Sequence, residues 1–93
     1  MKEIYRLDEI ATVLAATKDR DLVEEFLKSI LTGNEIEEIS SRWEIVKLLK
    51  TGMSQRKISE RLGVSLCKIT RGSKELRDND SAMDKMVEKF NKN

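Results

Sequence analysis

The 93-residue sequence contains no histidine and no proline, and it has a single cysteine, Cys67. A lone cysteine excludes a disulfide within the chain, and without histidine no familiar set of zinc ligands can be assembled. Only four glycines stand among abundant Leu, Ile, Glu and Lys, a composition that favours helix along the whole chain. The sequence therefore predicts an all-α fold without a bound metal.

Long apolar stretches are also missing. No run approaches the roughly 18 apolar residues that a membrane-spanning helix needs. Residues 1–6 carry charge and lack the apolar core of a signal peptide, so a cytoplasmic location without membrane attachment is expected. No glycine-rich phosphate loop and no pairing of a nucleophile with a base is visible, which disfavours an enzyme with catalytic residues.

Charge is nearly balanced overall, at +1, but it is unevenly distributed along the chain. Residues 1–53 carry eight basic and eleven acidic side chains, and residues 78–93 carry three basic and four acidic ones. The intervening residues 54–77 carry seven basic side chains against two acidic ones, a net charge of +5. This concentration favours binding to nucleic-acid phosphates, whereas ordinary clustering on a solvated helix face is the alternative.

Apolar residues recur at helical spacing and predict about six helices in a single domain. The helices are expected at about residues 7–18, 19–31, 35–50, 55–62, 66–77 and 81–90. The long third helix is apolar on more than one stripe, so one of its neighbours is expected to belong to another subunit. The domain is expected to consist of core and dimerisation helices in 1–53, a central helix-turn-helix in 54–77 and a C-terminal helix in 78–93.

The segment 54–71 matches the helix-turn-helix template along its length. Ser54 and Ser65 stand where they can cap two short helices, and Gly63 stands at the turn, where a positive φ is needed. Ser59 is small where the two helices cross. The apolar positions that would pack the helices together are Ile58, Leu62, Val64 and Ile69. A helical hairpin with an incidental glycine explains the turn, but it does not explain the basic outer face.

The outer face of the second short helix carries groups that can read base edges. Lys68 and Arg71 can donate to guanine, and Thr70 can offer its hydroxyl or its methyl group. Arg56 and Lys57 are expected at backbone phosphates. The predicted DNA-contacting residues are Gln55, Arg56, Lys57, Leu66, Cys67, Lys68, Thr70, Arg71 and Lys74. One helix reads few base pairs, so we expect a homodimer on an operator in double-stranded DNA, with its reading helices about 34 Å apart.

Two stretches resemble the Trp repressor family: Gly52-Met53-Ser54-Gln55-Arg56, and Ile69-Thr70-Arg71-Gly72-Ser73 followed by Leu76. The resemblance extends more weakly from about Leu31 to Leu76. It implies an intertwined homodimer that binds an operator, with L-tryptophan as a candidate corepressor between the long helix and the reading helix. The segment from Asn34 to Glu44 is more similar to the YerC-type relatives, which share the fold but are not established tryptophan sensors.

The same resemblance implies a set of ligand-binding residues. Arg71 matches an arginine that meets the indole and the carboxylate of tryptophan, and Arg42 resembles the second arginine beside the indole. Gly72 matches a glycine that lets the indole approach closely. Glu75 is a candidate partner of the ligand ammonium, or of a neighbouring basic residue. The implied ligand-binding residues are Leu31, Thr32, Arg42, Arg71, Gly72 and Glu75.

Three functions are compatible with these observations, and none of them requires a cofactor. The first is a DNA-binding repressor that responds to L-tryptophan, and the second is a ligand-independent DNA-binding relative. The third is a helical protein-interaction domain whose basic patch contacts an acidic partner. DNA binding through several phosphates predicts a steep loss of affinity with added salt, which the third function does not. Trp43 is interpreted as core and Cys67 as a small filler.

Overall fold

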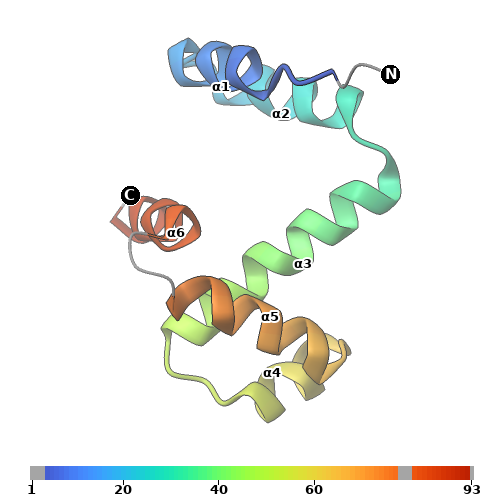
Figure 1. Cartoon of the computed structure of the whole chain (residues 1–93), viewed down its shortest axis with the longest axis vertical. Helices are drawn as coiled ribbons and strands as arrows, with labels where there is room; N and C mark the ends of the chain where they lie inside the picture. Colours follow the sequence, from blue (N-terminus) through green and yellow to red (C-terminus); the bar gives the residue numbers. More distant parts are fainter. Residues whose placement is uncertain (1–3, 78–80, 93) are drawn as a thin grey trace. The chain divides into compact units, whose positions relative to one another are not determined.

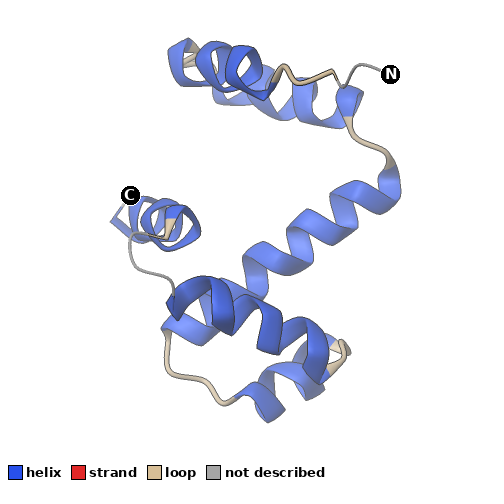
Figure 2. Ribbon diagram, in the orientation of Figure 1, coloured by secondary structure: helices blue, strands red, loops and turns tan. Residues whose placement is uncertain are grey.

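The computed structural model describes residues 4–77 and 81–92, and in these ranges every regular element is a helix (Figure 2). The helices are α1 (Leu7–Ala16), α2 (Arg20–Ile30), α3 (Gly33–Lys50), α4 (Gln55–Leu62), α5 (Leu66–Arg77) and α6 (Ala82–Lys92). The predicted all-α class is confirmed, and α4 and α5 have the bounds expected from the sequence. Across the described ranges, no helix has both the length and the apolar character required to cross a membrane.

Contacts divide the chain into two compact units, Met1–Ile36 and Glu37–Asn93, whose helices are labelled in Figure 1. The expected division into 1–53, 54–77 and 78–93 stays a prediction. Residues 1–3, 78–80 and 93, which include the start of the predicted C-terminal segment, lie outside the described residues.

The first unit contains α1 and α2, which leave much of their apolar surface open. Within residues 4–36, the described part of this unit, no side chain is fully buried. Leu7, Val13 and Leu22 are 58%, 63% and 57% exposed. Asp19 caps α2, because its carboxylate accepts hydrogen bonds from the backbone N–H groups of Asp21 and Leu22.

A reciprocal capping box starts α3. The hydroxyl of Thr32 accepts a hydrogen bond from the Glu35 N–H at 3.1 Å, and the Glu35 carboxylate accepts one from the Thr32 N–H at 2.8 Å. The predicted break at 32–34 is therefore only a junction between two helices. Because the cap fixes the first turn, α3 begins at Gly33, two residues before the expected start.

The core of the second unit joins α3, α4 and α5. In Figure 1, α4, α5 and α6 lie around the C-terminal half of α3. Ile45 of α3, Ile58 of α4 and Ile69 of α5 form one buried cluster. Half-buried residues pack against this cluster: Leu48, Leu49, Met53, Leu62 and Val64. Full burial of one such aliphatic side chain stabilises the fold by about 1.5–3 kcal/mol, so this cluster determines how α5 lies on α3.

The C-terminal helix α6 is attached by an apolar anchor and by charge. Val87 is fully buried. Lys50 of α3 forms ion pairs with Asp84 and, at 2.8 Å, with Glu88. The pKa of Lys50 is raised, first by the hydrogen bond to Asp84 and then by the one to Glu88. α6 is thus held against α3 by two acidic residues on successive turns.

Candidate DNA-reading surface and adjoining cavity

Local caps position the two short helices of the motif as the sequence predicted. The Ser54 hydroxyl accepts a hydrogen bond from the Lys57 N–H at 3.2 Å, and the Ser65 hydroxyl accepts one from the Lys68 N–H at 3.4 Å. Gly63 ends α4 with φ +67°, in the left-handed region where glycine has no steric penalty. Local residues therefore set where α4 begins and ends and where α5 begins.

Ser59 does more than provide a small side chain at the crossing of α4 and α5. Its hydroxyl donates a hydrogen bond to the backbone carbonyl of Val64 at 2.7 Å. This bond ties the last turn of α4 to the start of the connection to α5. The sequence indicates the small size of Ser59 at the crossing, but it does not indicate this bond.

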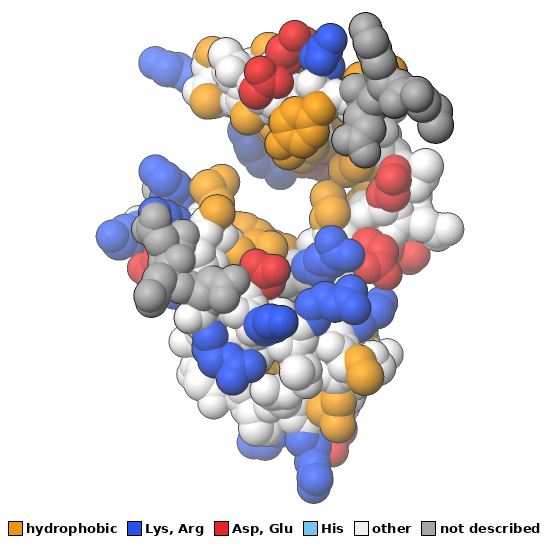
Figure 3. Space-filling model, viewed as in Figure 1, with side chains coloured by type: hydrophobic (Ala, Val, Ile, Leu, Met, Phe, Trp, Pro, Cys, Tyr) orange, Lys and Arg blue, Asp and Glu red, His pale blue; other side chains and the backbone are white. Residues whose placement is uncertain are grey.

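The predicted DNA-contacting residues lie on the open side of this motif. Ile69 is completely buried, which turns the opposite side of α5 outward. The exposed members of the predicted set are Arg56, Lys57, Leu66, Cys67, Lys68, Thr70, Arg71 and Lys74, and Gln55 is half-buried. On the face shown in Figure 3, Lys and Arg side chains gather over the second unit. The exposed basic face that phosphate binding requires is therefore present.

Two of the predicted DNA contacts bind each other. The Thr70 hydroxyl donates a hydrogen bond to the side-chain carbonyl oxygen of Gln55 at 3.2 Å, joining the start of α4 to the middle of α5. The Gln55 amide group then keeps its N–H donors for another partner. Gln55 is thereby positioned by Thr70, which the sequence did not indicate.

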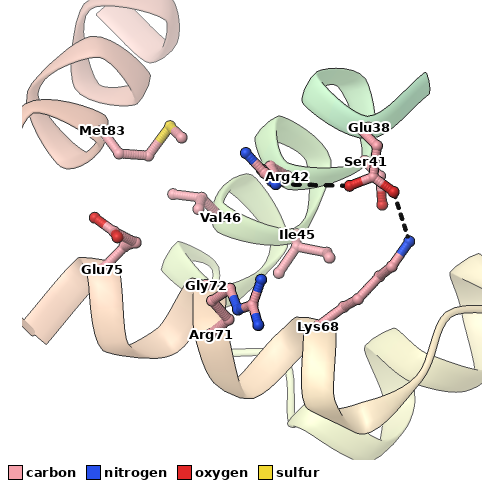
Figure 4. Close-up of a pocket in the computed structure, with 10 residues that line it drawn as sticks. All are labelled: Glu38, Ser41, Arg42, Ile45, Val46, Lys68, Arg71, Gly72, Glu75 and Met83. Atoms are coloured by element: carbon pink, nitrogen blue, oxygen red, sulfur yellow. Dashed lines mark hydrogen bonds and ion pairs between the residues drawn. The ribbon is translucent and has the colours of Figure 1, made fainter. Parts of the chain in front are cut away.

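A cavity of about 490 Å³ adjoins α5 (Figure 4). Four of the implied ligand-binding residues line it: Arg42 from α3, and Arg71, Gly72 and Glu75 from α5. Apolar side chains supply another part of the wall: Ile45, Val46 and Met83. The implied residues of α3 and α5 thus meet at one site. Leu31 and Thr32 belong to the first unit, and their assignment to this cavity stays a prediction.

Gly72 of α5 lies directly against Ile45 and Leu49 of α3. A Cβ atom at this position would stand 2.9 Å from the Cγ2 atom of Ile45, closer than real Cβ contacts. The structure therefore accounts for this glycine by contact between two helices. Its implied role beside an indole ring stays a prediction.

Glu38 carries the main electrostatic feature of the cavity wall. One of its carboxylate oxygens lies 3.1 Å from the Lys68 ammonium, and the other lies 3.7 Å from the Arg42 guanidinium (Figure 4). The pKa of Glu38 is lowered, chiefly by the hydrogen bond from Lys68 and the charge of Lys68, and further by Arg42 and Arg71. Sequence reasoning missed this group, because Glu38 and Lys68 are 30 residues apart.

Other polar groups of the wall form no hydrogen bond or ion pair within the part of the chain that the structure describes. Neither Arg71 nor Glu75 forms an ion pair or a hydrogen bond with any described residue. The Ser41 hydroxyl oxygen is buried, and no described group hydrogen-bonds to it. Trp43 does not line the cavity and packs edge-to-face on Phe90 at 6.0 Å between ring centroids. No group of three or more potential metal ligands occurs among the described residues.

The fold and the exposed basic face of α5 define the class of protein. A helix-turn-helix whose second helix is open and basic is the module with which many transcriptional regulators read the major groove. The family model described as Trp repressor protein matches residues 5–91, and the chain belongs to the Trp repressor family. This match confirms the resemblance seen in the two sequence motifs. The family is one of DNA-binding regulators.

Several relatives are similar along most of the chain, and each is named Trp operon repressor homolog. The relative from Xylella fastidiosa is 42% identical over 81 residues, covering 86% of this chain and 88% of its own. The one from Vibrio campbellii is 38% identical over 80 residues, covering 84% and 80%. The one from Chlamydia trachomatis is 29% identical over 79 residues, covering 84% of each chain. The comparison with solved structures found no match.

Proposed function

We propose that this chain is a homodimeric repressor that reads an operator with α5 and binds L-tryptophan as corepressor in the adjoining cavity. One observation carries the proposal: Lys68 and Arg71 belong both to the exposed face of α5 and to the cavity wall. A molecule that fills the cavity therefore touches the helix that contacts DNA. If this molecule binds more tightly to the arrangement of α5 that can contact DNA than to other arrangements, it would increase the fraction of the protein in that arrangement.

The unpartnered groups of the cavity suit a zwitterionic amino acid with a large apolar side chain. Arg71 can hold a carboxylate by a charge-assisted, two-pronged hydrogen bond, and Glu75 can accept from an ammonium group. The Ser41 hydroxyl offers one further polar contact. Ile45 and Val46 provide an apolar wall of the kind that small-molecule sites place beside a few polar groups.

Apolar surface on α1 and α2 supports the homodimer. Leu7 and Val13 of α1 and Leu22 of α2 are each more than half exposed. Large apolar side chains left open to solvent on neighbouring helices are the kind of surface that a partner chain covers. A second copy of the chain is the partner we propose, in an intertwined arrangement that brings two α5 helices to one operator.

Two measurements test the proposal. Calorimetric titration of the folded protein with L-tryptophan is expected to give saturable binding near one ligand per chain, and other amino acids serve as controls. Fluorescence anisotropy with a labelled DNA duplex is expected to show binding that strengthens with tryptophan and weakens steeply with salt. Weak dependence on salt would instead favour a protein-interaction domain with an acidic partner.

A ligand-independent DNA-binding regulator is the second candidate, and one observation favours it. Glu38 already connects Arg42 of α3 with Lys68 of α5, so the two helices are bridged without a ligand. This candidate predicts the same affinity for DNA in the presence of every amino acid. Calorimetry without heat of binding, in protein shown to be folded, would support it.

A further inference from the structure

The Glu38 carboxylate forms an ion pair with Lys68, a residue that is also among the predicted DNA contacts of α5. Lys68 is the third residue of α5, at its exposed N-terminal end, yet its side chain reaches back toward α3 (Figure 4). The ammonium lies 3.1 Å from Glu38, whose second oxygen faces Arg42. An ammonium group has three N–H donors, but the contact with Glu38 directs it toward α3 and offsets its charge, so this contact competes with a phosphate or a base edge in the groove.

We propose that Glu38 competes with DNA for Lys68 and thereby lowers the DNA affinity of this surface. The inference rests on the proposed function, because it takes α5 to be the DNA-reading helix. The Lys68 and Glu38 side chains are 50% and 49% exposed. An exposed ion pair of this kind changes an equilibrium by at most about five-fold, so DNA can break it. Glu38 therefore weakens binding without preventing it.

The packing of α5 argues that the pair is not required to hold this helix in place. Ile69 of α5 is completely buried against Ile45 of α3, and Gly72 lets the two helices touch one turn further on. These contacts are apolar and remain when the Lys68 ammonium moves. Removal of the Glu38 charge should therefore leave the position of α5 intact while it frees Lys68.

The test compares Glu38→Gln with Glu37→Gln in the full chain. Both variants remove one negative charge from α3, but Glu37 has no ion pair with any described residue. Binding to a mixed-sequence DNA duplex is measured by fluorescence anisotropy over a series of salt concentrations. Circular dichroism verifies that each variant keeps its helices.

Glu38→Gln is expected to bind DNA up to about five-fold more tightly for each α5 helix engaged, and Glu37→Gln distinctly less so. The dependence of log K on log salt should steepen by about 0.9 for each Lys68 that gains a phosphate. In a Lys68→Ala background, Glu38→Gln should bring no gain beyond that of Glu37→Gln, because the group for which Glu38 competes is missing.

Three results would overturn the inference. Equal gains for Glu38→Gln and Glu37→Gln would mean that only the overall charge matters. Weaker DNA binding by Glu38→Gln would mean that the pair positions α5. A gain above that of Glu37→Gln that persists in Lys68→Ala would exclude Lys68 as the contested group. If the wild-type chain binds no duplex at any salt concentration, with or without L-tryptophan, the proposed function fails and takes this inference with it, whereas DNA binding with any of the three results defeats the inference alone.

Discussion

Gly72 of α5 stands against Ile45 of α3 so closely that a Cβ atom on it would lie 2.9 Å from the Ile45 Cγ2 atom. Ile45 is 1% exposed and belongs to the buried cluster of α3, α4 and α5. Packed interiors leave little room for such a side chain to move aside. The distance between α3 and α5 therefore depends on the absence of a side chain at position 72.

Gly72→Ala is expected to destabilise the protein by about 1–3 kcal/mol, the usual cost of overpacking a well-packed core. This sign is opposite to that of helix propensity, which favours Ala over Gly by about 1 kcal/mol. Urea unfolding followed by circular dichroism measures the change. The matched control is Gly33→Ala in α3, where a Cβ would meet nothing within 4 Å, so neutral or slightly raised stability is expected. A Gly72→Ala protein as stable as Gly33→Ala would contradict the close contact.

Gly63 tests the turn between α4 and α5. Its φ of +67° is one that β-branched residues avoid and that Asn tolerates. Gly63→Val is expected to cost at least about 1–2 kcal/mol of stability, and Gly63→Asn clearly less. Denaturant unfolding of the two variants gives the comparison. Equal losses for Val and Asn would mean that the turn does not keep this conformation in solution.

The elements around the reading helix were predictable because their signals are local. Ser54, Gly63 and Ser65 each act on a neighbouring turn, so α4 and α5 could be bounded from the sequence alone. The start of α3 was placed two residues late, although Thr32 and Glu35 have the spacing of a capping box. Gly33 lies between these two residues, and the low helix propensity of glycine favours a later start than the capping box does.

The cavity was only partly predictable because its wall comes from three helices. The family motif indicated Arg71 and Gly72, and the resemblance indicated Arg42. Ser41 and Met83 lie on other helices, and no local pattern marks them as neighbours of α5. Glu38 could be paired with Arg42 from a spacing of one helical turn, but its pairing with Lys68 depends on how α5 lies on α3.

Lys68 and Lys57 are expected to play different parts in DNA binding. Lys68→Ala should weaken binding to an operator selected from a random library by about 1–3 kcal/mol more than binding to mixed sequence, because it removes a base contact. Lys57→Ala should weaken both about equally and reduce the salt slope by about 1, as loss of a phosphate contact does. Fluorescence anisotropy with both duplexes measures these effects. Equal weakening by Lys68→Ala would make Lys68 a phosphate contact as well.

The Glu38–Lys68 pair also predicts a pH effect. The pKa of Glu38 is lowered first by the hydrogen bond from Lys68, so Lys68→Ala should raise this pKa toward the ordinary value of about 4.3. Because the pKa is lower in the folded state, the contribution of Glu38 to stability is present above about pH 4.3 and is lost as the pH falls through the lowered value. Carbon-detected NMR titration of the Glu38 carboxyl measures the shift, and Lys57→Ala, which leaves the pair intact, should not change it. An identical Glu38 pKa in the wild type and Lys68→Ala would show that the pair does not form in solution, and the competition for Lys68 would then have no basis.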